Sequence, residues 1–229
     1  MRSLETNAGH RRHRASGFSL LEMMIVLAIA IVVSTVSVMS LMPVMNAQRV
    51  VNAYNTTLSA MRQGRDNAVS QRTSYSLTFS NSVSPNTITL APTLTGTSAF
   101  AGDQNTVTYQ LPTDVKFQTN AGITSTTAPD TSTGSSFGAG ANAIDFGYTA
   151  TVSTPTGSAI NTIYFCPDGS AQTSSTCAGV NYWDDGVVYL ARTGDVLSAR
   201  AVDLWGGTGR IHGWRLYAKS GGGYQWLRQ

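Results

Sequence analysis

Hydrophobic side chains dominate one continuous stretch near the start of the chain. Residues 18–42 are apolar or small, and Glu22 is the only charged residue among them. A helix of this length reaches about 37 Å, which exceeds the hydrocarbon core of a bilayer at about 30 Å. We therefore predict a single-pass transmembrane helix over 18–42. Residues 1–17 hold four arginines and one glutamate, and because positive charge resists translocation, the N-terminus should stay cytoplasmic while the rest is exported.

The helical pattern continues after Pro43, but only one face of it is apolar. Apolar or small side chains recur at helical intervals, at Val44, Ala47, Val51, Tyr54, Leu58, Met61 and Ala68. This spacing predicts an amphipathic helix over 43–72 that ends near Ser70 and packs its apolar stripe on a sheet. Pro43 would kink this helix, and Gly64 would weaken it near its end.

After Arg72 the hydrophobic period shortens to the two-residue alternation of half-buried strands. The clearest alternation joins Tyr75, Leu77 and Phe79. Thr193–Asp195 is typical of a hairpin turn, and the Ser, Thr, Gly and Ala of 119–142 are typical of a flexible loop. Because no helical pattern alternates with these strands, we predict an α+β fold with antiparallel sheets, and a β-rich globular domain over 73–229. The further candidate strands lie within 88–90, 107–111, 115–117, 144–148, 163–165, 187–190, 196–202 and 215–218.

Charge is scarce in this chain and unevenly distributed. Charged residues make up 12% of it, about half of the roughly 25% that is typical of soluble domains. Residues 73–204 hold nine acidic side chains against three basic ones, whereas no acid follows Asp203. The low charge and the many Gly, Ser and Thr residues favour an exported β-rich protein over a cytosolic enzyme.

The junction between the basic leader and the apolar stretch carries a distinctive motif. A small residue, Gly17, precedes the apolar run, whereas an ordinary secretory signal has its small-residue cleavage site after that run. The string Gly17-Phe18-Ser19-Leu20-Leu21-Glu22 resembles the class III signal of type IV prepilins and pseudopilins. The resemblance implies that prepilin peptidase cleaves after Gly17, which removes 1–17 as a leader, and that the new N-terminus at Phe18 is N-methylated.

Glu22 has a physical interpretation of its own. A carboxylate inside a membrane helix costs about 2.5–3.5 kcal/mol and is usually functional. In the pilin family this glutamate pairs with the amino group of the N-terminal Phe of a neighbouring subunit during assembly, and such pairing offsets the desolvation of both charges. The resemblance therefore implies an assembly role for Glu22, although a side chain that reaches back to the membrane interface remains an alternative.

The later part of the chain resembles the GspH/FimT family of minor pilins and pseudopilins. The order of Ile163–Gly169, Gly186–Leu190 and Gly209–Ile211 is similar to the C-terminal order of that family. The resemblance implies a long helix, half in the membrane and half packed on a sheet. It also implies a structural subunit of a type IV pilus or of a type II secretion pseudopilus. The expected partners are other pilin or pseudopilin subunits, prepilin peptidase and the inner-membrane assembly platform, and the expected location is the inner membrane followed by the filament.

The two cysteines, Cys166 and Cys177, are separated by turn-forming residues. In an oxidising periplasm they would close a short loop as a disulfide, which the chain-entropy model values at about 2.5–3 kcal/mol. A metal or redox role would require closer spacing or histidine partners.

Catalysis finds little support in the sequence, and we expect no catalytic residue, metal or cofactor. His212 is the only histidine beyond the leader, and we expect it to be a surface or tail residue. No nucleophile elbow is present, although spacing alone leaves a Ser-His-Asp site open because triads assemble in space. A membrane-anchored periplasmic enzyme thus remains the weakest alternative. The pair Asp184–Asp185 is more typical of a solvated turn than of a calcium site.

Basic and aromatic side chains alternate in the C-terminal basic segment, residues 205–229. Such a surface can neutralise phosphates and stack bases. Some FimT-type minor pilins bind DNA through a Gly-Arg-x-Arg element, and the matching positions here, 209–212, have histidine in place of the second arginine. An ordinary terminal strand, with Trp214, Leu216 and Ala218 on its buried face, is the competing interpretation. The candidate DNA-binding residues are Arg210, His212, Arg215, Lys219 and Arg228.

Overall fold

A computed structural model describes residues 18–93, 106–119, 142–148, 160–177 and 184–229. The leader with Gly17, and all but the ends of the predicted loop 119–142, lie outside these residues. The chain divides into two compact units, Met1–Val44 and Met45–Gln229, and the helix α1 (Leu20–Gln71) contributes to both.

The first unit consists, in its described part, of the apolar start of α1. Every side chain from Phe18 to Val44 is exposed, and α1 is long and apolar enough to cross a membrane by length and composition. Pro43 lies inside the helix, next to the boundary between the two units. An apolar helical surface with no protein cover is what a membrane span or a helix packed between subunits requires.

In the second unit the remainder of α1 packs on the β domain, with a buried face that overlaps the predicted stripe only in part. Tyr54, Met61 and Ala68 are buried as expected, whereas Val44 and Ala47 are exposed. The buried face also includes polar or small residues that hydropathy alone does not reveal. Arg72 has a positive φ of 52° directly after the helix and so ends it. The complete set of buried helical residues is Val50, Ala53, Tyr54, Thr57, Ala60, Met61, Gly64 and Ala68.

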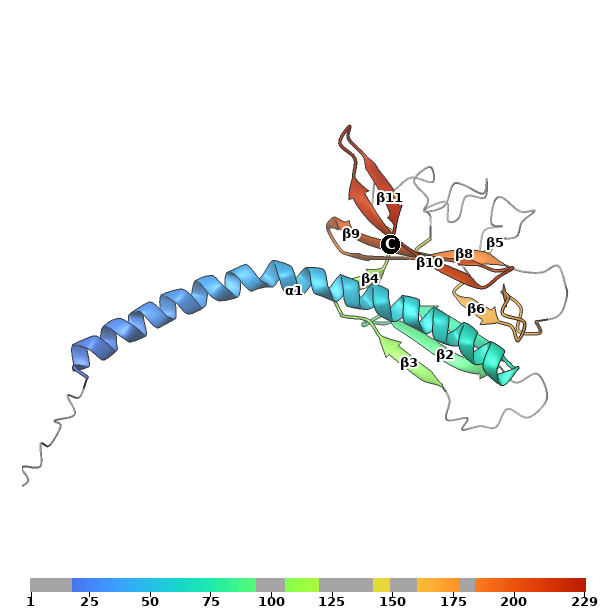
Figure 1. Cartoon of the computed structure of the whole chain (residues 1–229), viewed down its shortest axis with the longest axis horizontal. Helices are drawn as coiled ribbons and strands as arrows, with labels where there is room; N and C mark the ends of the chain where they lie inside the picture. Colours follow the sequence, from blue (N-terminus) through green and yellow to red (C-terminus); the bar gives the residue numbers. More distant parts are fainter. Residues whose placement is uncertain (1–17, 94–105, 120–141, 149–159, 178–183) are drawn as a thin grey trace, which may run out of the picture. The chain divides into compact units, whose positions relative to one another are not determined.

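Eleven strands among the described residues form two antiparallel sheets, which confirms the predicted α+β class (Figure 1). All the strand candidates of the sequence appear. The two strands that were not predicted are β7, with two residues, and β11, which follows three glycines. The first sheet has the order β3 (Val107–Gln110), β2 (Thr87–Thr93), β1 (Ser74–Ser80), β6 (Thr162–Phe165) and β7 (Ala171–Gln172). The second has the order β11 (Tyr224–Arg228), β10 (Arg210–Ala218), β9 (Asp195–Trp205), β8 (Asp185–Arg192) and β4 (Val115–Phe117), and β5 (Ile144–Tyr148) also pairs with β8.

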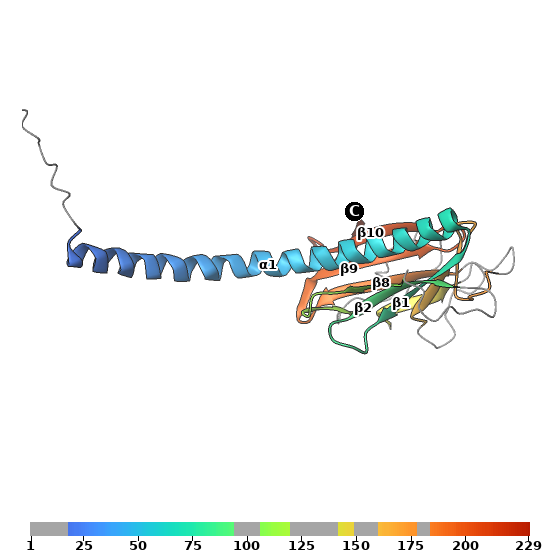
Figure 2. The ribbon, with the colours of Figure 1, turned by 90° about the horizontal axis from the view of Figure 1, so that it is seen from below.

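The main core lies between the buried face of α1 and the inner faces of both sheets. Figure 2 shows this half of α1 running alongside β8, β9 and β10 of one sheet and β1 and β2 of the other. A smaller cluster, which includes Tyr189 and Trp226, covers the opposite face of the second sheet. Because β8 is buried on both faces, its sequence is a continuous apolar run over 187–190 rather than an alternation.

Candidate functional site

The first candidate site is the start of α1. Phe18 lies two residues before the helix and is 77% exposed, and Glu22 lies exposed in the first helical turn. Because the amide groups at a helix N-terminus carry partial positive charge, they favour a carboxylate in this turn. Gly17 lies outside the described residues, so the geometry of the scissile bond is not part of the structure.

The two cysteines form a disulfide, Cys166–Cys177, at the end of β6. A tight turn follows Cys166, because the backbone amide of Gly169 donates to its carbonyl at 2.9 Å. The carboxylate of Asp168 accepts hydrogen bonds from the backbone amide and the hydroxyl of Ser170, at 2.9 and 2.7 Å, and these bonds lower the pKa of Asp168. The turn is therefore fixed by both covalent and polar contacts.

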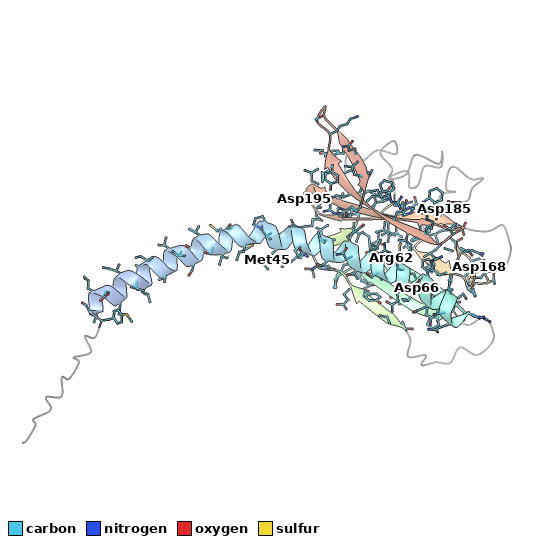
Figure 3. The ribbon with its side chains drawn as sticks, viewed as in Figure 1. Met45, Arg62, Asp66, Asp168, Asp185 and Asp195 are labelled. Atoms are coloured by element: carbon cyan, nitrogen blue, oxygen red, sulfur yellow. A yellow bond between two sulfur atoms is a disulfide. The ribbon has the colours of Figure 1, made fainter. Side chains whose placement is uncertain are left out.

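The second candidate site is a cavity of about 420 Å³ in the second unit, which we call the basic cavity. Its charged members are four arginines, one histidine and one aspartate, contributed by α1, β10 and β11. In the described part of the chain none of these four arginines forms a salt bridge. Figure 3 shows Arg62 and Asp66 in sequence along α1. The lining residues are Arg62, Arg65, Asp66, Gly209, Arg210, Ile211, His212 and Arg228.

Arg65 connects the three segments that surround one end of the basic cavity. Its Nε donates to the carbonyl of Gly169 at 3.3 Å and its Nη2 donates to the carbonyl of Thr208 at 3.2 Å. Gly209 follows with a positive φ of 59°, and a Cβ at this position would collide with the carbonyl of Gly169. The helix, the disulfide turn and the β9–β10 turn thus meet closely enough that only glycine fits at 209.

His212 lies in the C-terminal segment as expected, but it is half-buried rather than fully exposed. It belongs to β10 and lies opposite Asp203 of β9, and its side chain is only 12% exposed. The backbone amide of His212 donates to Oδ1 of Asp203 at 3.0 Å, and the imidazole Nδ1 lies 3.4 Å from the same oxygen. Asp203 is completely buried. The strand pairing therefore holds a histidine between a buried carboxylate and the basic cavity.

Of the five candidate DNA-binding residues, the structure brings three together in the basic cavity: Arg210, His212 and Arg228. Arg215 instead lies over the ring of Tyr217, with 4.9 Å from its guanidinium carbon to the ring centroid. Lys219 is exposed in the turn after β10 and does not line the cavity. In the terminal strand Leu216 is buried and Trp214 half-buried as expected, whereas Ala218 is exposed.

Sequence reasoning missed Arg62 and Arg65 as members of this site. The available signal was an excess of arginine in the second half of the helix, where four arginines accompany one aspartate over 49–72. Nothing in the sequence indicated that Arg62 and Arg65 would line a cavity together with residues of β10.

Asp184 and Asp185 are not a solvated turn, so that expectation is wrong. Asp184 is 9% exposed and accepts from the backbone amide and hydroxyl of Thr173, both at 2.6 Å. Asp185 accepts from the backbone amide of Gly206 at 2.5 Å, and burial raises its pKa. Among the described residues no group of three or more potential metal ligands is found.

The comparisons with known proteins agree with the first candidate site. The family model described as prokaryotic N-terminal methylation motif matches residues 12–38, which include Gly17, Phe18 and Glu22. No curated protein and no solved structure matches the chain. The motif is the class III signal of type IV pilins, and together with one N-terminal apolar helix it supports a membrane-anchored, type IV pilin-like protein that prepilin peptidase processes. Such a motif indicates a structural protein rather than an enzyme.

Proposed function

We propose that this chain is a minor pilin or pseudopilin, a structural subunit that enters a type IV pilus or a type II secretion pseudopilus through its N-terminal helix. The single observation that carries the proposal is the methylation motif at the start of an apolar helix whose side chains are exposed from Phe18 to Val44. Cleavage after Gly17 would remove the basic leader and leave a free amino group on Phe18, four residues before Glu22.

Assembly in this proposal depends on a charge pair between subunits. A carboxylate in a membrane is costly unless an opposite charge accompanies it, and the N-terminal amine of a neighbouring subunit supplies that charge. The apolar side chains around Glu22 are exposed throughout the described part of the first unit. They would be buried by lipid before assembly and by neighbouring helices afterwards.

Substitution of Glu22 tests this assembly role. Glu22→Gln keeps the shape and removes the charge, so we expect normal leader removal but a loss of about 3–5 kcal/mol of assembly free energy, since one partner of a buried pair is left alone. The measurement is the fraction of the chain in sheared filaments relative to membranes, in a host with the matching filament machinery. Ser34→Ala, which removes a hydroxyl bonded within the same helix, is the matched control. Wild-type incorporation of Glu22→Gln would contradict the assembly role.

A second candidate function, binding of nucleic acid by the exported domain, is favoured by the basic cavity. Four arginines without a carboxylate partner among the described residues line one concave site. Arginine pairs well with phosphate because its planar guanidinium presents paired donors. We propose that this cavity, rather than the exposed turn with Lys219, contacts the nucleic-acid backbone.

Salt dependence tests this second function. Arg210→Ala should weaken binding of DNA and lower the slope of log affinity against log salt by about 0.9 if it removes one phosphate contact on duplex DNA. Lys116→Ala removes an exposed positive charge of the same domain that does not line the cavity, and it should leave the slope unchanged. Equal slopes for the two variants would argue against the cavity as the contact site.

A further inference from the structure

We propose that the basic cavity is a pH-dependent phosphate pocket, in which protonation of His212 completes the cationic lining. This inference rests on the second proposed function, binding of a nucleic-acid phosphate at the same cavity. Arginine remains charged throughout the physiological range, whereas histidine changes its charge between about pH 5 and pH 8. The chain therefore combines four permanent cations with one conditional cation in a single cavity.

The position of His212 explains why its protonated form can exist inside the fold. Oδ1 of the completely buried Asp203 lies 3.4 Å from the imidazole Nδ1. A buried carboxylate is costly without a nearby positive charge, and a protonated imidazole at this distance supplies one. The same oxygen accepts the backbone amide of His212 at 3.0 Å, so β9 and β10 fix the two groups relative to each other.

Some of the other charged groups around His212 oppose its protonation and others favour it. The guanidinium groups of the cavity oppose a further positive charge, whereas Asp203 and Asp66 favour it. Arg200 of β9 lies three residues before Asp203 and opposite Arg215, and its side chain donates to the carbonyls of Ser198 and Ala199 at 3.1 and 3.0 Å. The charged groups that line the cavity together with His212 are Arg62, Arg65 and Asp66 of α1, Arg210 of β10 and Arg228 of β11, and Asp203 of β9 lies opposite His212 in the strand pairing.

Tyr54 of α1 lies against β10 at Gly213, the residue after His212. A Cβ at Gly213 would collide with its hydroxyl, so the helix approaches the strand directly beside His212. Burial raises the pKa of Tyr54 above its ordinary value of 10.0. This tyrosine therefore stays neutral across the range in which histidine titrates and contributes no charge to the switch.

A bound phosphate changes the balance in favour of protonation. Its negative charge offsets the guanidinium groups, so the cost of a further cation in the cavity falls. By thermodynamic linkage, if phosphate binding favours the protonated imidazole, then protonation strengthens phosphate binding by the same factor. A phosphodiester keeps its single negative charge from about pH 5 to pH 8, so a change in affinity over this range comes from the protein.

The test compares oligonucleotide binding near pH 5.5 and near pH 8 at constant ionic strength. It uses the full chain in detergent micelles and a labelled single-stranded oligonucleotide, with affinity measured by fluorescence anisotropy. His10 and His13 are changed to Gln in every sample, so that only one of the three histidines remains. We expect the protein with His212 to bind roughly tenfold more tightly at the lower pH, within the usual range of coupling between two sites.

Two substitutions at position 212 separate the switch from the site itself. His212→Arg should bind tightly at both pH values, because its charge is permanent. His212→Gln should bind weakly at both. Isothermal titration in buffers of different ionisation enthalpy should show proton uptake on binding at intermediate pH for the protein with His212, and markedly less for His212→Gln.

The outcomes distinguish this inference from the proposed binding of nucleic acid on which it rests. Absence of oligonucleotide binding at both pH values would overturn the nucleic-acid function and the inference together. Binding whose pH dependence and proton uptake persist in His212→Gln would overturn the inference alone, because other carboxylates would then account for them. Since the proton-uptake measurement on the protein that retains His212 needs no change at this position, the test does not depend on a variant that fails to fold.

Discussion

The two units of this chain expose their hydrophobic side chains in opposite ways. In the first unit Ile25, Val33 and Leu41 are between 52% and 58% exposed, and their neighbours are similar. In the second unit Phe79, Phe146 and their neighbours are almost completely buried between α1 and two sheets. The second unit therefore has its own core, whereas the first needs lipid or other subunits to cover it.

The largest effect that would test this contrast is a deletion in the second core. Phe79 contacts Phe117 and Phe146 across the two sheets, with ring centroids 5.6 Å apart in each pair. Phe79→Ala should lower the free energy of unfolding of the second unit by about 3–5 kcal/mol, because it removes buried contacts and leaves a cavity. Chemical denaturation followed by tryptophan fluorescence measures this.

The matched change in the first unit is Val33→Ala, at a side chain that is 58% exposed. Val33→Ala should leave the free energy of unfolding of the second unit unchanged within about 0.5 kcal/mol. A comparable loss of unfolding free energy for both variants would contradict the contrast between the exposed side chains of the first unit and the buried core of the second.

Removal of the disulfide is the next largest change. Cys166→Ser combined with Cys177→Ser should cost about 2–4 kcal/mol of unfolding free energy, because the open loop gains entropy in the unfolded chain. The affinity of the basic cavity should also fall, since the carbonyl of Gly169, in the turn after Cys166, accepts from Arg65. Denaturation of the double variant, with and without reductant, and oligonucleotide binding provide the two measurements. Unchanged stability would show that the bond is dispensable.

A smaller effect concerns the pH dependence of stability. Burial raises the folded pKa of Asp185 above its ordinary value of 3.8, so the folded state binds more protons there than the unfolded state. The contribution of Asp185 to the free energy of unfolding is therefore complete below pH 3.8 and decreases as the pH rises through the folded pKa. Asp185→Asn should remove this decrease and leave a flatter profile in thermal melts between pH 4 and neutrality. The same slope in both proteins would contradict the role of Asp185.

Local patterns predicted most of the fold. The period-two segments and the turn at Gly194, which has a positive φ of 81°, depend on neighbours along the chain and were predicted correctly. The helical stripe was predicted only in part because the buried face also includes Thr57 and Gly64, and Gly64 allows a close approach of Phe165. Hydropathy assigns neither residue to a core, so only the packing partner identifies that face.

The candidate sites differ in the same way. The motif at Gly17–Glu22 is contiguous, so its recognition needs no tertiary contact. The basic cavity joins residues that are far apart in sequence: Arg65 and Thr208, which it bonds, are 143 positions apart. The contact of His212 with Asp203 likewise depends on the register of β9 and β10. The sequence supplied the basic residues of the C-terminal segment, but only the fold selects which of them share a cavity.

The mass of the intact mature chain, extracted from membranes of cells that contain prepilin peptidase, tests the central claim most directly. The account predicts a chain of residues 18–229 that begins at Phe18 and carries one added methyl group, with the apolar first unit retained. A chain that still begins at Met1, or one that is cut after residue 42 so that the apolar helix is lost, would contradict it.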